Sequence, residues 1–171
     1  RLITFNLFNC LGVMPINNFT NDIKNLTLEK KSIISKLGIR IGAKFFFMPH
    51  FMKKNAIELN AILWKTFNNY NLLEKLPLPK NGRVSFLSDF DMPEDYWQAI
   101  GYLCINKFAV RIDVFERIFY LARQKIKIGP FLESSDLMNP IGCNSNQLSD
   151  LLNYCGINNI NIGDEKKLFY Y

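Results

Sequence analysis

The sequence lacks the short motifs that identify the common catalytic centres. It contains no G-x-x-x-x-G-K-[ST] phosphate loop and no G-x-S-x-G nucleophile motif. Its single histidine, His50, has no cysteine or histidine near it, and no C-x-x-C pair occurs among the cysteines Cys10, Cys104, Cys143 and Cys155. A zinc site needs clustered ligands, so we expect no metal site and free thiols in a reducing compartment.

Long apolar runs are also missing. A membrane helix needs roughly 20 apolar residues in a row, whereas the run from Leu2 to Val13 is shorter and contains Asn6 and Asn9. The same stretch lacks the basic segment, apolar centre and small-residue cleavage site of a signal peptide. We therefore expect a cytoplasmic chain with no membrane partner. Because the sequence starts at Arg1 and ends within an apparent strand, we also expect a fragment of a longer protein.

Acidic residues are fewer than basic ones. The chain has 15 Asp and Glu against 21 Lys and Arg, a net charge of +6. This balance favours a polyanionic partner such as RNA or DNA. The many Asn, Ile, Lys and Phe residues are also what AT-rich coding produces, so part of the basic charge can be compositional. Hydrophobic residues make up 49% of the chain, enough for a core in one domain or two small ones.

The clearest local pattern is an amphipathic helix within 109–124. Its apolar residues recur at three- and four-residue steps and share one face: Phe115, Ile118, Phe119 and Ala122. Asp113 followed by Glu116 has the spacing of a capping box at the start of a helix. We therefore assign structural capping roles to both carboxylates.

The residues that follow have the order of a winged helix-turn-helix. An apolar run over 126–131 predicts a strand, and Ser134 and Ser135 predict the start of a short helix. Asn144, with Gln147 three residues later, predicts a capping box for a second helix.

Gly156 ends that helix, and 157–162 and 167–171 have the pattern of two strands joined by a turn at 163–164. We predict an α+β fold of helices and short strands, ending in a winged helix-turn-helix-like unit over 109–171.

The N-terminal part has helical patterns around one expected strand. Thr27 predicts the N-cap of a helix that ends at Gly38, and 39–48 has the composition of a single strand. A longer helix is expected over 53–69. Its buried stripe would contain Ala56, Leu59, Leu63 and Phe67, and that of the preceding helix Leu28, Ile33, Ile34 and Leu37. The Pro-rich stretch 77–83 is the best linker candidate, which gives a helical region with one strand at 1–76 and an α+β region at 84–171.

Six basic residues are candidates for contact with nucleic acid: Arg40, Lys44, Lys53, Lys54, Lys166 and Lys167. Arg40 and Lys44 would share a face of the expected strand, and Lys53 and Lys54 begin the next helix. A solvated basic rim explains these four residues equally well.

The C-terminal candidates belong to the expected wing. Lys166 and Lys167 lie beside Phe169, Tyr170 and Tyr171, where a wing can follow a backbone or stack on bases. No Lys or Arg occurs between 145 and 155, so the second helix is a poor reader of a DNA groove.

Two other groups have simpler interpretations than a site. The acidic group Asp89, Asp91, Glu94 and Asp95 suits the cap and first turn of a helix better than acid–base catalysis. The run 45–47 is three phenylalanines, which can stack on bases, but strand alternation favours core packing.

Several short blocks resemble the C-terminal region of a group of bacterial helicases. These blocks are 37–42, the aromatic run into Met48-Pro49, 59–64, Gly101-Tyr102, 109–117, and Ile141-Gly-Cys143 followed by a helix ending at Cys155-Gly156. Together they extend over nearly the whole chain. They resemble the alphaproteobacterial superfamily 2 helicases related to the mitochondrial RNA-degradosome helicase.

This resemblance implies a division of labour. ATP and magnesium would bind two upstream RecA-like motor domains, and this region needs no cofactor of its own. Gly38 and Gly42 precede a strand-like run here, not a helix start that could bind phosphates. The region would then be a non-catalytic accessory part that binds RNA or DNA or braces the motor domains. The competing class is a protein-interaction or structural module without nucleic acid contact.

Overall fold

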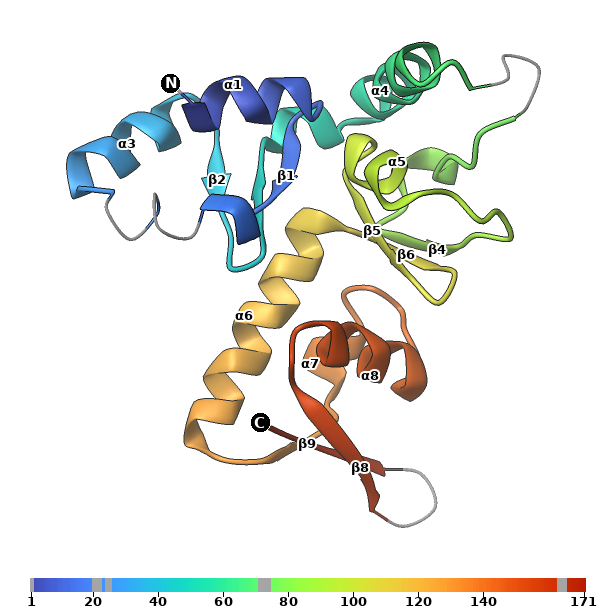
Figure 1. The fold of residues 1–171 in the computed structure, drawn as a ribbon. Coiled ribbons are helices and arrows are strands. Elements are labelled where there is room, and N and C mark those ends of the chain that lie inside the picture. The colour runs from blue at the N-terminus through green and yellow to red at the C-terminus, as the bar shows by residue number, and fades with distance from the viewer. Residues whose placement is uncertain (1, 20–22, 24–25, 71–74, 163–165) are drawn as a thin grey trace.

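The computed structural model describes residues 2–19, 23, 26–70, 75–162 and 166–171. These residues form an α+β fold with seven α-helices and three small antiparallel sheets of three strands each, which confirms the predicted class. The longest helix, α6 (Ile112–Ile128), has the first two sheets near its start and the third near its end (Figure 1). No helix among the described residues is long and apolar enough to cross a membrane.

The first sheet contains β1 (Val13–Pro15), β2 (Arg40–Ile41) and β3 (Phe45–Phe47) in the order β1-β3-β2. The single strand expected over 39–48 is therefore wrong, because the chain reverses at 42–44 and forms a hairpin. Arg40 and Lys44 consequently do not share a strand. All three phenylalanines of the central strand β3 are buried, as core packing predicted.

Two helices accompany this sheet. The helix α1 (Leu2–Asn9) precedes β1, and η1 (Asn17–Phe19) and α3 (Leu28–Lys36) lie between β1 and β2 in the sequence. Thr27 caps α3 by accepting a hydrogen bond from the Lys30 N–H at 3.4 Å, as predicted. Of the expected buried stripe of this helix, Ile34 is buried as predicted, whereas Leu28, Ile33 and Leu37 are exposed.

The second sheet has the order β4-β6-β5, with β4 (Ser85–Leu87), β5 (Tyr102–Ile105) and β6 (Phe108–Arg111). The strands β5 and β6 form a hairpin, and Asn106 and Lys107 adopt φ values of 48° and 66° at its turn. Two 3-10 helices and two α-helices precede β5 in the sequence: η2 (Pro49–Met52), α4 (Lys54–Phe67), η3 (Lys80–Gly82) and α5 (Glu94–Ala99).

The buried face of α4 differs from the expected one. Ile57, Asn60, Ala61 and Trp64 are buried, whereas Leu59, Leu63 and Phe67 are exposed. Asn60 explains the rotation, because its Nδ2 donates to the carbonyls of Leu11 at 3.1 Å and Ala99 at 2.9 Å. A polar residue with two backbone partners is buried at little cost.

The third sheet follows α6 and has the order β7-β9-β8. Its elements and the helices between them are β7 (Phe131–Leu132), α7 (Ser135–Met138), α8 (Ser145–Tyr154), β8 (Asn158–Ile162) and β9 (Lys166–Tyr170). The strand expected over 126–131 is mostly wrong, because α6 continues to Ile128. The predicted turn at 163–164 lies outside the described residues.

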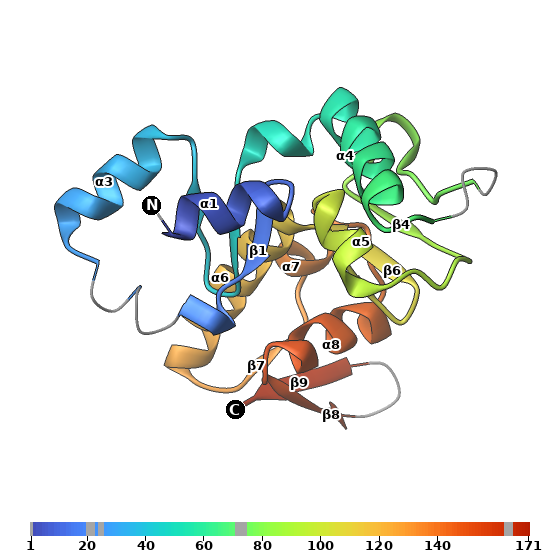
Figure 2. The ribbon, with the colours of Figure 1, turned by 45° about the horizontal axis from the view of Figure 1, so that its top comes forward.

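The largest apolar core is centred on α6. Phe115, Ile118 and Ala122 of this helix pack in one cluster with Phe45 and Phe47 of the first sheet, together with residues of both other sheets and of α8. Figure 2 shows α6 passing between the N-terminal elements and the C-terminal unit. The core thus joins residues on both sides of 77–83, while the proposed domain division stays a prediction.

The predicted caps have different outcomes. Asn144 caps α8, and its capping box with Gln147 is confirmed by hydrogen bonds of 2.9 Å in both directions. The capping box at Asp113 and Glu116 is wrong, because α6 begins earlier, with Arg111 at its N-cap and no side-chain cap. Asp113 instead pairs with Arg111 and accepts from the adjacent Val114 N–H, and Glu116 is directed to the first sheet.

Candidate nucleic-acid interface

Glu116 fixes the turn of the β2–β3 hairpin onto α6. Its carboxylate accepts hydrogen bonds from the backbone N–H groups of Ala43 at 2.6 Å, Lys44 at 2.8 Å and Phe45 at 2.7 Å. Successive N–H groups in a turn form the kind of concavity that binds anions. Here the anion is the protein's own carboxylate, and Gly42 leaves room for it, because a Cβ at residue 42 would overlap the carboxylate in its present position.

A hollow of about 580 Å³ lies between this hairpin and the first half of α6. We call it the basic hollow. Its lining residues are Arg40, Ile41, Gly42, Ala43, Phe47, Pro49, Asp113, Glu116, Arg117, Tyr120 and Arg123. Arg117, Tyr120 and Arg123 follow one another at three-residue steps on α6, so they project from neighbouring turns on the same side.

The acidic residues of the basic hollow are already engaged. Asp113 accepts from Arg111 at 2.7 and 3.1 Å, and Glu116 accepts from the backbone turn. Beyond Arg111–Asp113, the described residues contain one further ion pair, Lys125–Asp136. Arg40, Arg117 and Arg123 therefore have no acidic partner within the described residues, and they give the hollow a net positive charge.

Two cations are oriented by an aromatic ring. The Lys44 ammonium lies 5.7 Å, and the Arg123 guanidinium 5.8 Å, from the centre of the buried Phe119 ring. A cation over a ring face gains about 0.5–1 kcal/mol when exposed. The contact restricts both side chains near the hollow, and the 60% exposed Tyr120 adds an accessible ring. This arrangement can bind phosphates and stack on a base.

The structure brings two of the six predicted basic residues to this place. Arg40 lines the hollow from β2, and Lys44 lies in the turn beside it. Lys53 and Lys54 are exposed at the start of α4 and do not line the hollow. Sequence reasoning missed Arg117, Tyr120 and Arg123, although their spacing on the polar side of the amphipathic helix was a usable signal.

The two remaining candidates lie on β9 and differ from each other. Lys166 is exposed. Lys167 donates from Nζ to Asn146 Oδ1 at 2.7 Å and to Ser149 Oγ at 3.1 Å, so it joins the hairpin to α8. The other polar residues of α8 are also engaged, as Asp150 accepts from Asn106 and Asn153 from Asn159, both at 2.9 Å.

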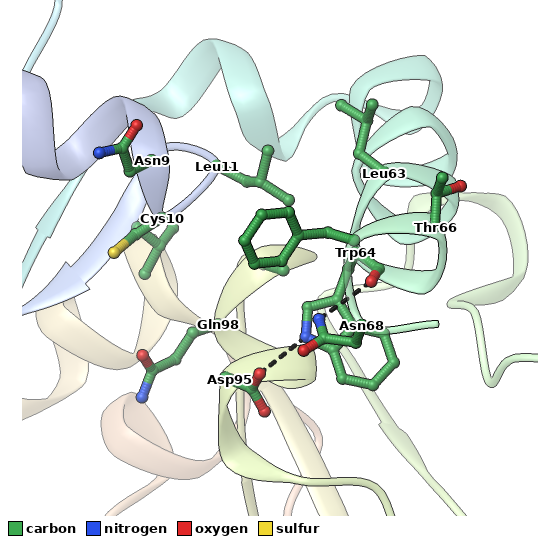
Figure 3. Close-up of a pocket in the computed structure, with 12 residues that line it drawn as sticks. Asn9, Cys10, Leu11, Leu63, Trp64, Thr66, Asn68, Asp95 and Gln98 are labelled. Carbon is green, nitrogen blue, oxygen red and sulfur yellow. Dashed lines mark hydrogen bonds between the residues drawn. The ribbon is translucent and has the colours of Figure 1, made fainter. Parts of the chain in front are cut away.

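A second hollow, of about 480 Å³, is mainly apolar and lies between the end of α1, α4 and α5 (Figure 3). Its lining residues are Asn9, Cys10, Leu11, Val13, Leu63, Trp64, Thr66, Phe67, Asn68, Asp95, Gln98 and Ala99. Asp95 accepts from Trp64 Nε1 at 2.9 Å, so its carboxylate is engaged. Desolvation raises the pKa of the Cys10 thiol, which favours the unreactive protonated form. Without a basic residue, this hollow does not suit a phosphate.

The described residues contain no group of three or more His, Cys, Asp or Glu side chains that could bind a metal ion. All four cysteines are free, with Cys10 exposed and Cys143 and Cys155 buried. Comparison of the chain with protein-family models, curated proteins and solved structures finds no significant match. The basic hollow is therefore the best candidate site on its geometry and charge alone.

Proposed function

We propose that this chain is a non-catalytic accessory region of an ATP-dependent helicase, and that it contacts RNA or DNA through the basic hollow. The observation that carries the proposal is the convergence of Arg40, Arg117 and Arg123 in one concavity whose carboxylates are already engaged, with Lys44 in the adjoining turn. Arginine forks suit phosphate oxygens because they donate two parallel hydrogen bonds.

The order of the C-terminal elements supports a winged-helix-like unit within this region. A helix, a strand, two helices and a hairpin follow one another, and the first strand pairs with the last in the order β7-β9-β8. A groove-reading role for α8 is disfavoured, because Asn146 and Ser149 are bonded to Lys167 and the helix has no cation. In this proposal the winged-helix-like unit braces the motor domains, while the basic hollow contacts the strand of RNA or DNA.

Binding of short oligonucleotides at several salt concentrations tests the proposal. Each neutralised phosphate on a single strand contributes about −0.7 to the slope of log K against log salt. Three or four contacts predict a slope of about −2 to −3, and Arg117→Glu with Arg123→Glu should make it shallower by about 1.4. Fluorescence anisotropy of labelled 12-nucleotide RNA and DNA measures both quantities.

A matched control separates the hollow from total charge. Lys31 is exposed on α3 and does not line the hollow, so Lys31→Glu applied with Lys30→Glu makes the same change in net charge. Equal loss of affinity in both double variants would mean that binding depends on overall charge. An unchanged affinity in the arginine variant would reject the basic hollow as the interface.

A protein-interaction module is the second candidate function. The exposed apolar residues of α4 favour it: Leu59, Ile62, Leu63 and Phe67, of which Leu63 and Phe67 line the apolar hollow. An apolar contact changes little with salt, whereas phosphate contacts weaken steeply.

In the helicase proposal, ATP hydrolysis belongs to upstream domains, so the isolated chain should show no ATP hydrolysis in a coupled assay.

A further inference from the structure

The strand β4 presents one free edge. Two hydrogen bonds at its ends show which side faces β6. The Ser88 N–H donates to the Lys107 carbonyl, and the Arg111 N–H donates to the Val84 carbonyl, both at 2.8 Å. Successive residues of a strand direct their backbone groups alternately to the two sides. The N–H and C=O groups of Ser85 and Leu87 therefore point away from β6, and no other described strand pairs with β4.

This edge lies in a hollow of about 740 Å³, which we call the edge groove. Its lining residues are Lys75, Leu76, Pro77, Leu78, Lys80, Arg83, Ser85, Phe86, Leu87, Ser88, Asp89, Phe90, Phe108, Gly142 and Gln147. None of them lines the basic hollow.

The walls of the edge groove are fixed from within the core. Buried Tyr96 donates to the Pro77 carbonyl at 2.6 Å, and buried Tyr102 donates to the Arg83 carbonyl. On the opposite side, Ser85 Oγ donates to the Ile141 carbonyl. A groove anchored in this way is already formed before a ligand binds, which lowers the entropic cost of binding.

The charges of the edge groove are mainly positive. Lys75, Lys80 and Arg83 are exposed and have no acidic partner within the described residues, and Asp89 is the single acidic residue in the lining. Leu87 and Phe90 are 68% and 52% exposed and offer apolar contacts between these charges.

We propose that the edge groove binds an extended acidic peptide of a partner protein, which adds a strand to β4. Such a peptide supplies a donor for each free carbonyl and an acceptor for each free N–H, while its carboxylates meet Lys80 and Arg83. A nucleic acid backbone matches the charge but has no N–H row for the strand carbonyls. A second copy of this chain would bring Lys80 and Arg83 of both copies together, and like charges repel.

Nuclear magnetic resonance of the full labelled chain tests this proposal. The probe is a capped six-residue peptide that alternates valine with glutamate. The expected result is a saturable shift of the Ser85 and Leu87 amide signals. A version with N-methylated backbone should bind at least tenfold more weakly, because it cannot donate to the strand. A lysine–valine version should also fail to bind.

Two kinds of variant test the two parts of the recognition. Leu87→Pro removes an N–H that faces the groove and leaves the β6 ladder intact, and Leu87→Ala is its matched control. We expect Leu87→Pro to bind the peptide at least tenfold more weakly and Leu87→Ala to bind it as the parent chain does. Lys80 and Arg83 lie on the surface, and Lys80→Glu and Arg83→Glu should each weaken peptide binding about two- to fivefold. They test the proposal even if the proline variant does not fold.

Three outcomes would overturn the proposal. Equal binding of the N-methylated peptide would mean that the strand edge is not used. The same signal shifts with a six-nucleotide uridine RNA at equal or tighter affinity would assign the groove to nucleic acid. Shifts at Ser85 and Leu87 that depend on protein concentration without peptide would assign it to a second copy.

Discussion

Removal of the Glu116 carboxylate tests how α6 is joined to the first sheet. Its oxygens accept from three backbone N–H groups at 2.6–2.8 Å. Hydrogen bonds to a charged group contribute about 1.5–3 kcal/mol each. Ala43 and Lys44 are half-exposed and can regain water, whereas the buried Phe45 N–H cannot. We expect Glu116→Ala to lower the free energy of unfolding by about 3–5 kcal/mol.

Two related changes give this prediction more detail. Glu116→Gln retains one acceptor oxygen for the Lys44 and Phe45 N–H groups, so it should cost about half as much. Gly42→Ala perturbs the same contact from the other side, because its Cβ would overlap the carboxylate. In the Glu116→Ala background that overlap disappears. The double variant should therefore cost clearly less than the sum of the single variants.

Urea denaturation followed by circular dichroism measures these differences. Arg117→Ala is the control, because this neighbour is exposed and should change the free energy of unfolding by no more than about 0.5 kcal/mol. The reasoning fails if Glu116→Ala unfolds within about 1 kcal/mol of the parent chain. It also fails if Gly42→Ala and Glu116→Ala are additive.

Three further predictions concern the C-terminal unit. Asn144→Ala removes the cap of α8 and should cost about 1 kcal/mol in urea denaturation, more than Asp113→Ala, whose carboxylate forms a partly exposed ion pair and one hydrogen bond with the adjacent Val114 N–H. Equal losses would contradict the assignment of the caps. Lys167→Ala removes the bonds to Asn146 and Ser149 and should increase hydrogen exchange in β8 and β9, whereas Lys166→Ala should not. Burial raises the pKa of Cys155 from 9.0 to about 12, so the folded state retains this proton more tightly than the unfolded state. Stability from this group is complete below pH 9 and is lost as the pH rises to 12, by up to about 1.4 kcal/mol per pH unit. Cys155→Ala should flatten that slope, and an unchanged slope would mean that the thiol does not contribute.

Local chemistry explains what the sequence could predict. The capping box of Asn144 and Gln147 depends on two side chains and the backbone between them, so it is recognisable without tertiary information. The same applies to the Thr27 cap. The α+β class and the burial of the β3 phenylalanines also follow from residue patterns alone.

Distant partners explain what the sequence could not predict. Glu116 had the spacing of a capping box, but the N–H groups that donate to its carboxylate lie more than 70 positions away in the chain, at residues 43–45. The same contact ends the strand expected over 39–48, because the turn at 42–44 needs an acceptor for its N–H groups. Asn60 is a second example. A count of apolar residues places this polar side chain on the exposed face of the helix, whereas its hydrogen bonds to two backbone carbonyls keep it on the buried face.

Glu116 also links the fold to the proposed function. The carboxylate fixes the hairpin turn to α6, next to the packing of Phe45 on Phe115, and so holds Arg40 and Lys44 near Arg117 and Arg123. Simple electrostatics predicts that Glu116→Gln, which removes a negative charge, strengthens nucleic acid binding. The geometry predicts the opposite, because a looser turn separates the cations and increases the entropy lost on binding. We expect affinity for the labelled 12-nucleotide RNA to fall at temperatures where the variant stays folded. A rise in affinity would mean that the basic hollow acts through charge alone.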